Sequence, residues 1–320
     1  MVTDAATETT SGTSTDHLTD RSVTVVIATR DRPELLRRAI AGVEQQTHDQ
    51  HVEIILVFDR SEPDLALARD EDNFRIVVTT NVHSPGLAGA RNSGIKMASN
   101  NWIALCDDDD EWLPGKLSAQ FDALESNPDA RAACTGIFIR YEGDDTPRVP
   151  DPAKMTFEEF LNDRMTEVHP SSWLVHRQTF IDDVGLVDEN IPGGYAEDYD
   201  FILRTVRFGP IAVAEKPLVR IWWHGGSFFF ERWKTIDEAL QYILTKYPEF
   251  EQQPKGLARI KGQQAVARAA MKDRSSAVRT AWETFKLSKT EKRVPVALII
   301  AAGLPADRAL KMAHRFGKGI

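Results

Sequence analysis

Five consecutive acidic residues, Asp107 to Glu111, follow directly after the apolar run Trp102 to Cys106. The apolar run predicts a buried strand, and because unpaired carboxylates are costly to bury, the acids belong at its C-terminal end. Alternate side chains of an extended chain point the same way, so Asp107 and Asp109 can share one cation. Hard oxygen ligands at this spacing suit Mg²⁺ or Mn²⁺, which keep water and phosphate oxygens as further ligands. The plain alternative is a solvated acidic loop, or the first turn of a helix near Pro114, where acids interact favourably with the helix dipole.

Strands alternating with helices would position these acids at one edge of a sheet. β-branched and apolar runs predict strands, and apolar residues at helical spacing predict the helices between them. The alternation indicates an α/β fold with a mainly parallel sheet wound on both faces, where ligands bind beyond the C-terminal ends of the strands. The expected strands are Val23 to Ala28, Val52 to Phe58, Arg75 to Thr79, Trp102 to Cys106, Ala130 to Tyr141, Ser171 to His176, Ile211 to Ala214 and Leu218 to Trp223, with a polar helix ending at Asp70 and a turn at Gly143 to Pro147.

Several classes of protein lose support from the sequence. The glycine fingerprint of dinucleotide-binding proteins is missing after the first strand, where Thr29, Arg30 and Asp31 stand, so a nicotinamide or flavin enzyme is disfavoured. No segment approaches the roughly 20 apolar residues needed to span a bilayer, and the N-terminus lacks a signal-peptide pattern. Two cysteines, Cys106 and Cys134, form neither a disulfide framework nor a metal set, and both are expected in buried strands. A cytoplasmic protein is expected.

Composition and charge divide the chain. Residues 1–20 carry almost nothing apolar and are expected to be disordered. Residues 255–320 hold 15 Lys and Arg against 4 Asp and Glu, although the net charge of the whole chain is −9. From Thr235 onward the pattern is helical, and one of its apolar stripes is formed by Val278, Ala281, Trp282 and Phe285. The basic residues either solvate the outer faces of helices packed on the core or lay this region on an anionic membrane surface.

Five segments, in this order, resemble the landmarks of the family 2 glycosyltransferases with the GT-A fold. They are Val25 to Pro33, Glu53 to Ser61, Gly89 to Gly94, the acidic run from Asp107, and Glu197 to Phe201 with Arg204. The resemblance covers residues 23–224, some two thirds of the chain. It implies a mainly parallel, Rossmann-like sheet flanked by helices, with a C-terminal helical appendage. The expected division is a tail at 1–20, a glycosyltransferase domain at 21–230 with a nucleotide-sugar half at 21–115 and an acceptor half at 116–230, and a basic helical region at 231–320.

The resemblance also implies which residues bind the donor. The loop after the first strand is similar to the family's base-binding loop, where the planar guanidinium of Arg30 replaces an aromatic residue that often stacks on the base. Asp59 matches the aspartate that hydrogen-bonds the base, but Phe58 replaces the acid that commonly precedes it, which leaves the nucleotide open. Arg91 matches the arginine beside the donor diphosphate and sugar, and Asp108 matches a position that reaches the ribose. The implied nucleotide-sugar set is Ala28, Thr29, Arg30, Asp31, Asp59, Gly86, Arg91, Asp107 and Asp108.

Metal and catalytic roles follow from the same resemblance. The stretch Asp107 to Asp109 matches the family's DXD motif, which implies that Asp109, helped by Asp107, holds Mn²⁺ or Mg²⁺ on the donor diphosphate. His224 is similar to a late histidine of the family that binds metal or diphosphate. Asp198, with Glu197 beside it, matches the family's Glu-Asp motif and is implied to be the general base that takes the acceptor's proton. His169 and Trp223 are candidate acceptor-binding residues.

Together these residues predict an inverting, metal-dependent glycosyl transfer to an acceptor hydroxyl. The expected donor is a nucleoside-diphosphate sugar of the UDP, GDP or dTDP type, and the acceptor is a saccharide, a lipid-linked molecule or a small molecule. Such a reaction would serve cell-envelope polysaccharide, glycolipid or natural-product glycosylation. The basic C-terminal region makes peripheral contact with the inner face of the membrane a further expectation, and no nucleic-acid partner is expected.

Two other functions remain open at this point. A sugar-phosphate nucleotidyltransferase also joins an α/β nucleotide domain to metal-binding acids, but it would normally carry a glycine-rich, lysine-bearing loop where Thr29 to Pro33 stand. A catalytically silent scaffold that binds sugar nucleotides would keep the fold without turnover. The presence of both Asp109 and Asp198 argues against the scaffold.

Overall fold

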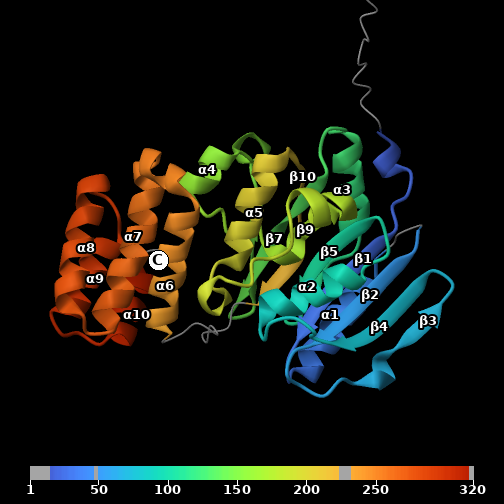
Figure 1. Cartoon of the computed structure of the whole chain (residues 1–320), viewed down its shortest axis with the longest axis horizontal. Coiled ribbons are helices and arrows are strands. Elements are labelled where there is room, and N and C mark those ends of the chain that lie inside the picture. Colours follow the sequence, from blue (N-terminus) through green and yellow to red (C-terminus); the bar gives the residue numbers. More distant parts are fainter. Residues whose placement is uncertain (1–14, 47–49, 223–231, 317–320) are drawn as a thin grey trace, which may run out of the picture.

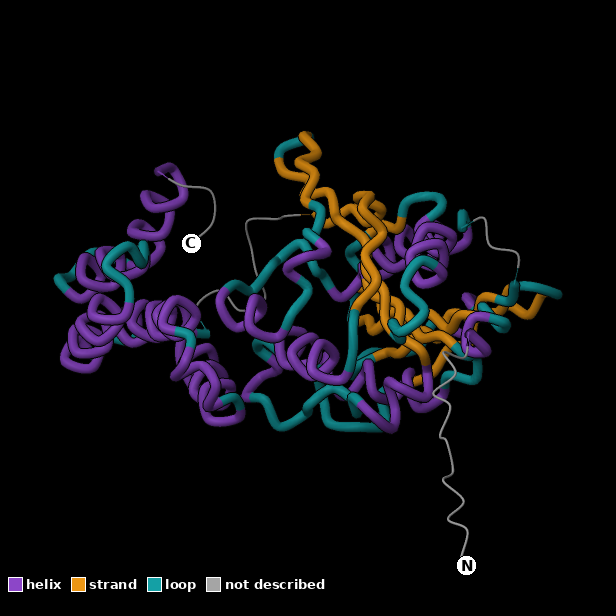
Figure 2. Tube along the Cα trace, turned by 90° about the horizontal axis from the view of Figure 1, so that it is seen from above, coloured by secondary structure: helices purple, strands orange, loops and turns teal. Residues whose placement is uncertain are grey.

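The computed structural model describes residues 15–46, 50–222 and 232–316, which form one ten-stranded sheet and its helices. Figure 2 shows the strands gathered in one half of the molecule and the C-terminal helices in the other. The strand order is β3-β4-β2-β1-β5-β9-β7-β10-β6, with β8 paired to β7. The strands are β1 (Val23–Thr29), β2 (Val52–Phe58), β3 (Arg69–Glu71), β4 (Phe74–Thr80), β5 (Trp102–Asp107), β6 (Glu111–Trp112), β7 (Ala132–Tyr141), β8 (Asp144–Arg148), β9 (Trp173–His176) and β10 (Ile211–Trp222).

The half of the sheet that carries the acidic run is parallel. β4, β2, β1 and β5 run in the same direction, and Val23 of β1 is in register with Val52 of β2 and with Trp102 of β5. β9 is inserted antiparallel between β5 and β7, while β7 and β10 are again parallel. The predicted α/β class with a mainly parallel sheet is confirmed.

Helices cover both faces of this sheet (Figure 1). Val23, Val25 and Ile27 of β1 share one core with α1 (Pro33–Glu44) and α3 (Lys116–Glu125). Val26 belongs to the other core, with α2 (Leu87–Met97) and α5 (Glu197–Phe208). Alternate side chains therefore enter opposite cores, which explains why β1 and β2 read as continuous apolar runs rather than as an apolar-polar alternation.

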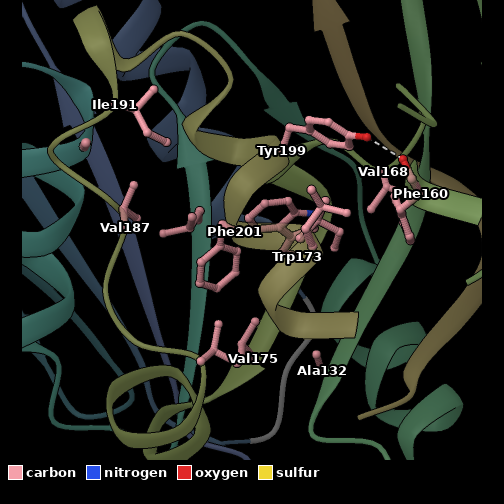
Figure 3. Close-up of a cluster of buried hydrophobic side chains, with 14 of the residues drawn as sticks. Ala132, Phe160, Val168, Trp173, Val175, Val187, Ile191, Tyr199 and Phe201 are labelled. Carbon is pink, nitrogen blue, oxygen red and sulfur yellow. Dashed lines mark hydrogen bonds between the residues drawn. The ribbon is translucent and has the colours of Figure 1, made fainter. Parts of the chain in front are cut away.

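Aromatic packing under α5 fixes the helix that carries the predicted general base. Trp173 stacks on Phe201 with ring centroids 4.9 Å apart, and the ring of Phe180 lies 4.5 Å from that of Phe201. Figure 3 shows Trp173 and Phe201 side by side in this cluster, with the Tyr199 hydroxyl directed at the Phe160 carbonyl oxygen, to which it donates a 2.5 Å hydrogen bond. Because Phe160 lies on α4 (Phe157–Asn162), this bond ties α4 to the first turn of α5.

The C-terminal helices lie at the end of the molecule opposite β3 and β4 (Figure 1). They are α6 (Trp233–Lys246), α7 (Pro254–Ala270), α8 (Arg274–Leu287), α9 (Arg293–Ala301) and α10 (Ala306–Phe316). α6 and the start of α7 share the core beneath α5, whereas the rest of α7 packs with α8, α9 and α10 around small residues such as Ala265, Ala281 and Ala297. Among the described residues, no helix combines the length and apolarity that a bilayer span requires.

Two predictions about local structure are wrong because the strands of two hairpins were missed. The polar helix expected to end at Asp70 is a short 3-10 helix, η2 (Leu65–Leu67), followed by β3, which pairs antiparallel with β4 across the two residues Asp72 and Asn73. The turn expected at Gly143 to Pro147 is instead the strand β8. Its hairpin turns at Glu142 and Gly143, whose φ angles of 50° and 97° suit a two-residue turn with positive φ at both positions.

Three further differences concern the continuity of β10, the start of the ordered chain and the buried face of α8. The strands expected at Ile211 to Ala214 and Leu218 to Trp223 form one strand, β10, whose register with β7 shifts around Pro217 because proline cannot donate to the ladder. Thr15–Leu18 form the 3-10 helix η1, and Leu18 is buried, so ordered chain begins before the expected Ser22. On α8 the buried residues are Ala277, Thr280, Ala281 and Thr284, while Val278 and Trp282 of the predicted apolar stripe are exposed.

Candidate active site

The C-terminal ends of β1, β2 and β5 meet at one edge of the sheet, as the register of these parallel strands requires. Loops after each strand add polar side chains there, and α5 brings its first turn to the same place. Among the described residues, three non-glycine residues with positive φ adjoin this edge: Asp31 at 53°, Arg60 at 52° and Ala196 at 67°. Residues in this region of φ are strained by about 1 kcal/mol or more, and such strain clusters at functional sites.

The acidic run turns sharply at the end of β5. Asp107 is the last strand residue, and its backbone N–H donates to Ser171 Oγ at 2.9 Å. Ser171 Oγ in turn donates to Asp110 Oδ2 at 2.5 Å, and the Asp110 backbone N–H donates to the Asp107 carbonyl oxygen at 3.1 Å. Ser171 belongs to the 3-10 helix η4 (Pro170–Ser172), so η4 fixes the direction in which the acids project.

Asp107, Asp110 and His169 present ligand atoms that all lie within 4.8 Å of one another. Burial raises the pKa of the Asp110 carboxyl well above its usual range, and the neighbouring charges of Asp107 and Asp109 raise it further. Burial lowers the pKa of His169, which favours the neutral imidazole that can ligate a metal. The two carboxylates repel each other and the imidazole is neutral, so the three groups together fit a divalent cation of the Mn²⁺ or Mg²⁺ type.

Asp109 lies outside that group of three. Arg32 Nη1 contacts Asp109 Oδ2 and Asp108 Oδ1 at 3.1 Å each, and Arg38 donates to the Asp109 carbonyl oxygen at 2.9 Å. The Asp109 side chain is 36% exposed, against 3% for Asp110. Burial and the charge of Asp107 raise the pKa of Asp109, so this carboxylate would also gain from a cation. Of the two acids, Asp109 is the one that a molecule in the cleft can reach.

Arg91 joins the acidic strand end to the start of α5. Its Nη2 donates to Asp107 Oδ1 at 2.5 Å and its Nη1 to Glu197 Oε1 at 2.6 Å, and its side chain is almost fully buried. Burial raises the pKa of Glu197 to about 8, with Arg91 opposing the rise and Asp198 and Asp107 adding to it. Burial also acts to raise the pKa of Asp107, but Arg91 and other positive groups hold it below its usual value. One guanidinium thus pairs with two carboxylates, and the pKa of the second, Glu197, stays raised in spite of this pairing.

Asp198 follows Glu197 in the first turn of α5, after Ala196 in the left-handed region. Its Oδ1 accepts the backbone N–H of Tyr199 at 2.7 Å, and its Oδ2 is contacted by the guanidinium of Arg164. The charges of Asp198 and Asp107 both act to raise the pKa of His169 and of Arg91. The predicted general base and the acidic strand end therefore face the same small region.

The loop after β1 touches the acidic run. Thr29 Oγ1 donates to Asp108 Oδ2 at 2.7 Å, and burial raises the pKa of Asp108 to about 6 against the opposing effects of Thr29 and Arg32. Ala28 and Thr29 end the strand, while Arg30 and Asp31 follow it as an exposed ion pair with 3.7 Å between Nε and Oδ2. A pocket of about 180 Å³ opens here between the ends of β1 and β2, lined by Thr29, Asp31, Arg32, Pro33, Leu36, Arg37, Phe58, Ser61, Glu62, Asp64 and Leu67.

Asp59, at the end of β2, is tied to the loop before α2. Asn81 Nδ2 donates to Asp59 Oδ1 at 2.9 Å and the Gly86 backbone N–H donates to the same oxygen at 3.1 Å. Burial acts to raise the pKa of Asp59, but these bonds and Arg60 hold it below its usual value. Gly86 has a φ of 124°, which residues with a side chain rarely adopt, so this loop depends on glycine. In this structure Asp59 shapes the loop in addition to any contact with a base.

The predicted site residues divide into three groups. The largest group comes together at one edge of the sheet. It consists of Ala28, Thr29, Arg30, Asp31, Arg91, Asp107, Asp108, Asp109, His169, Glu197 and Asp198. Asp59 and Gly86 lie beside them on the neighbouring strand end. His224 and Trp223 lie outside the described residues.

Sequence reasoning missed four residues of this region. Arg32 and Arg164 contact predicted site acids, while Ser171 and Asp110 each form a hydrogen bond with the backbone of Asp107. Arg32 and Asp110 stand within segments that carried a motif, so their proximity to the site was visible in the sequence. Ser171 and Arg164 come from loops without a motif, and only the fold brings them to the acids.

The sequence profile of the family described as Glycosyl transferase family 2 matches residues 24–182. An uncharacterized glycosyltransferase of Methanocaldococcus jannaschii, MJ1057, is 26% identical over 192 residues, which is 58% of this chain and 64% of that protein. The E. coli protein WfgD is named as a β-1,3-glucosyltransferase that uses UDP-Glc and α-D-GlcNAc-diphosphoundecaprenol; it is 29% identical over 108 residues, 34% of this chain and 43% of that protein. The chain therefore spans less than two thirds of the length of these two relatives.

Solved structures share the fold over most of the chain. Residues 1–349 of S. aureus TarS, solved with UDP-GlcNAc, match with a TM-score of 0.58 and 13% identity over 92% of this chain and 90% of that one. The mannosyltransferase PcManGT of Pyrobaculum calidifontis, solved with GDP-Man and Mn²⁺, matches with a TM-score of 0.53 and 13% identity over 88% and 85%. At 13% identity these comparisons show the fold alone, and that fold is the GT-A fold.

Proposed function

The chain belongs to glycosyltransferase family 2 and has the GT-A fold, and we propose on this basis that it transfers a sugar from a nucleoside-diphosphate sugar to an acceptor hydroxyl with inversion. The observation that carries the proposal is the link made by Arg91, which contacts Asp107 at the end of β5 and Glu197 at the start of α5. This link brings an acidic group suited to a cation beside a separate carboxylate, Asp198, suited to a base. A group-transfer enzyme needs both.

The donor side of the proposal rests on β1, β2 and β5. The pocket beside Thr29 and Asp31 is proposed to take the nucleoside, and Asp108 with its raised pKa is proposed to meet the ribose. The solved neighbours were obtained with UDP-GlcNAc and with GDP-Man, so the comparisons leave the nucleotide of this chain open. Phe58, which replaces the usual acid, keeps it open from the sequence as well.

Asp107 and Asp109 are proposed to hold Mn²⁺ or Mg²⁺. A metal bound there would supply Lewis-acid stabilisation of the charge on the leaving diphosphate. An ion that also contacts the donor needs ligands that reach the cleft, and Asp109 is 36% exposed whereas Asp110 is 3% exposed. Asp110, held by Ser171, is therefore proposed to stabilise the turn after β5, and His169 is proposed to remain a neutral neighbour of the metal. To serve as ligand, Asp109 must leave Arg32.

Asp198 is proposed to accept the proton of the acceptor hydroxyl. The bond from the acceptor oxygen to the anomeric carbon forms as the bond from that carbon to the diphosphate oxygen breaks, the proton passes to Asp198, and the nucleoside diphosphate leaves. Its Oδ1 accepts the backbone N–H of Tyr199, while its Oδ2 is held by a side chain, that of Arg164, which has to move aside for the acceptor hydroxyl. Glu197, bound to Arg91, is proposed to fix the start of α5 rather than to exchange protons.

The acceptor is proposed to be a sugar on a polyprenyl diphosphate lipid. WfgD is named for such an acceptor, and a relative of Campylobacter jejuni, 33% identical over 101 residues, is named as acting on a diphosphoundecaprenol-linked glycan. Of the three processes that the sequence led us to expect, such an acceptor favours cell-envelope glycan assembly. It also requires the enzyme to reach a membrane surface.

The C-terminal helices are proposed to make that membrane contact. Trp282 and Val278 on α8 are 58% and 47% exposed, and Leu298 and Ile299 on α9 are 42% and 47% exposed. Lys286 lies over the Trp282 ring at 5.6 Å, so a basic group adjoins this exposed aromatic side chain. Exposed aromatic and aliphatic side chains with flanking basic residues suit the interface of an anionic bilayer.

A ligand screen with two variants tests the function. Thermal shifts with UDP, GDP, dTDP and their sugars, each with and without Mn²⁺, should identify one donor, because a ligand that binds the native state raises its apparent stability. With that donor, Asp109→Asn should lose the Mn²⁺-dependent shift, whereas Asp198→Asn should keep it and lose turnover by about 10²-fold or more. Full turnover in Asp198→Asn would remove its assignment as base. Pyrophosphate release from a nucleoside triphosphate and a sugar phosphate would instead identify a nucleotidyltransferase.

A further inference from the structure

The proposed general base is paired with an arginine in this structure. The guanidinium of Arg164, on the loop between α4 and η4, contacts Asp198 Oδ2. Arg164 is followed by Met165, a non-glycine residue with a φ of 45°, so the backbone that presents the arginine is itself strained. This contact occupies the one Asp198 oxygen that does not accept the Tyr199 backbone N–H, so an acceptor hydroxyl can reach that oxygen only after Arg164 moves away.

A second arginine, Arg259, reaches the same place from α7. Arg259, on α7, donates from Nη2 to the Tyr199 hydroxyl at 2.9 Å, and the Arg259 and Arg164 guanidinium carbons each lie 5.2 Å from the centre of the Tyr199 ring. The Tyr199 hydroxyl donates its own hydrogen bond to the Phe160 carbonyl oxygen, as Figure 3 shows. One tyrosine ring therefore holds two cations close to Asp198.

These two arginines carry more hydrogen-bonding capacity than the described part of the chain satisfies. Arg164 Nη1 and Arg259 Nε are buried and have no hydrogen-bond partner among residues 15–46, 50–222 and 232–316. Burial lowers the pKa of Arg259, and the charges of Arg164 and Arg293 lower it further while the nearby Tyr199 opposes this. Buried charged donors without an acceptor are costly, and such groups in native structures call for an explanation. An anion that accepts from both would remove the cost.

We propose that Arg164, supported by Arg259, recognises a phosphate or diphosphate on the sugar that offers the hydroxyl, and that this anion draws Arg164 away from Asp198 and frees the base. The inference rests on the proposed function and names the class of acceptor at the same site. A phosphate offers several charged oxygens to the planar fork of donors on a guanidinium, which makes it a strong competitor for a carboxylate. A neutral acceptor leaves the ion pair intact, so the site selects acceptors with an anionic group within the width of one sugar ring from the reacting hydroxyl.

A plainer role for Arg164 predicts different behaviour. If Arg164 only holds Asp198 in place, its loss would impair turnover equally for anionic and neutral acceptors and would leave anion binding unchanged. Binding measured without donor and without metal separates the two roles, because no chemistry is involved. It also separates this inference from the proposed function, since anion binding can be present or absent whether or not the protein transfers a sugar.

The test uses calorimetric titration of the full chain in EDTA with N-acetylglucosamine 1-phosphate, N-acetylglucosamine and inorganic phosphate. The sugar phosphate should bind the wild-type protein more tightly than either of the other two. Arg164→Gln should weaken its binding by about tenfold or more, and Arg164→Lys, which keeps the charge, should lose less. Asp198→Asn should tighten it, because the competing carboxylate is gone. Arg207→Gln is the matched control, since Arg207 pairs with Glu249 at the far end of α5 and should leave binding unchanged.

Three results would overturn the inference. Equal binding of the sugar phosphate by wild type and a folded Arg164→Gln protein would exclude recognition by Arg164. Weaker binding by Asp198→Asn would contradict the competition between carboxylate and phosphate. Binding of inorganic phosphate as tight as that of the sugar phosphate would point to an adventitious anion site. Thermal melting of each variant checks that it folds, and the Arg164→Lys protein keeps the test decisive if Arg164→Gln does not.

Discussion

Replacing Lys116 by methionine should change how the stability of the protein depends on pH. Lys116 is the first residue of α3 and is fully buried. Its ammonium donates to Gln120 Oε1 at 2.9 Å and lies 3.7 Å above the centre of the Trp112 ring. Among the described residues these are neutral partners, and burial lowers the pKa of Lys116 to about 7 while the nearby Cys106 and Cys134 oppose the shift. In the unfolded chain a lysine titrates near 10.4.

The sign of the effect follows from proton binding. Between pH 7 and pH 10 the unfolded chain holds the Lys116 proton and the native protein releases it, so stability rises with pH in this interval. Below pH 7 both states are charged and the full cost of burying the ammonium is present. Each pH unit is worth about 1.4 kcal/mol, so between pH 6 and pH 9.5 this group adds about 3 kcal/mol to the free energy of unfolding. Lys116→Met removes that contribution while keeping a similar volume.

Urea denaturation at several pH values between 6 and 9.5 measures the effect. The free energy of unfolding of Lys116→Met minus that of the wild type should fall by about 3 kcal/mol across this range, with similar m values for the two proteins. Lys96→Met, at an exposed position on α2, is the control and should follow the wild type in parallel. If the Lys116→Met and wild-type profiles are also parallel, the ammonium is solvated or paired, and the reasoning from its burial is refuted.

Three further predictions concern packing, the metal and the membrane. Gly94→Ala on α2 should destabilise the protein by about 1–3 kcal/mol in chemical denaturation, because an added Cβ would lie 2.4 Å from Val26 Cγ1, whereas Gly209→Ala, with no atom within 4 Å, should be close to neutral. In Mn²⁺ titrations followed by electron paramagnetic resonance in the presence of donor, Asp109→Asn should weaken metal binding by at least about tenfold and Asp110→Asn should weaken it less; the reverse order would move the metal to the buried acid. Trp282→Glu should reduce co-sedimentation with phosphatidylglycerol vesicles, while Met97→Glu, an exposed apolar position on α2, should not, and equal losses would refute a specific surface on α8.

The parallel half of the fold was predictable because its signals are local. β1, β2 and β5 are continuous apolar runs that end in polar motifs, and each lies where the sequence predicts it, within one or two residues. The same holds for α1, whose apolar residues follow helical spacing. The hairpins β3–β4 and β7–β8 were missed because polar, exposed edge strands lack that periodicity, and only the turn residues at Asp72 and Glu142 announce them. The stripe predicted on α8 is half right: Ala281 is buried and Phe285 packs against the same core, but the other buried positions are Ala277, Thr280 and Thr284 rather than Val278 and Trp282.

Much less of the candidate site could be predicted, because a motif reports residues that meet a ligand and not those that hold them. The acids Asp107 to Asp110 are adjacent in sequence, yet their partners differ: Asp107 binds Arg91, Asp108 binds Thr29 and Arg32, Asp109 binds Arg32, and Asp110 binds Ser171. Those partners come from three separate segments, and neither spacing nor composition relates them. The division between the buried Asp110 and the more exposed Asp109 also depends on which way the turn after β5 runs, and that direction is set by η4.

The arginines of the site support one common interpretation. Asp107, Asp109 and Asp198 are each paired with an arginine in this structure: Arg91, Arg32 and Arg164. Isolated carboxylates this close together would repel one another, so the arginines stabilise the protein without substrates. The three pairs differ in exposure, since the Arg91 side chain is 3% exposed while those of Arg164 and Arg32 are 19% and 44% exposed. Arg91 is therefore fixed, whereas Arg32 and Arg164 can exchange their carboxylates for a substrate's phosphates. On this reasoning the donor diphosphate draws Arg32 from Asp109 on one side of the cleft, and the acceptor phosphate draws Arg164 from Asp198 on the other. A metal ligand and a base would then become available only when the molecules that need them have arrived.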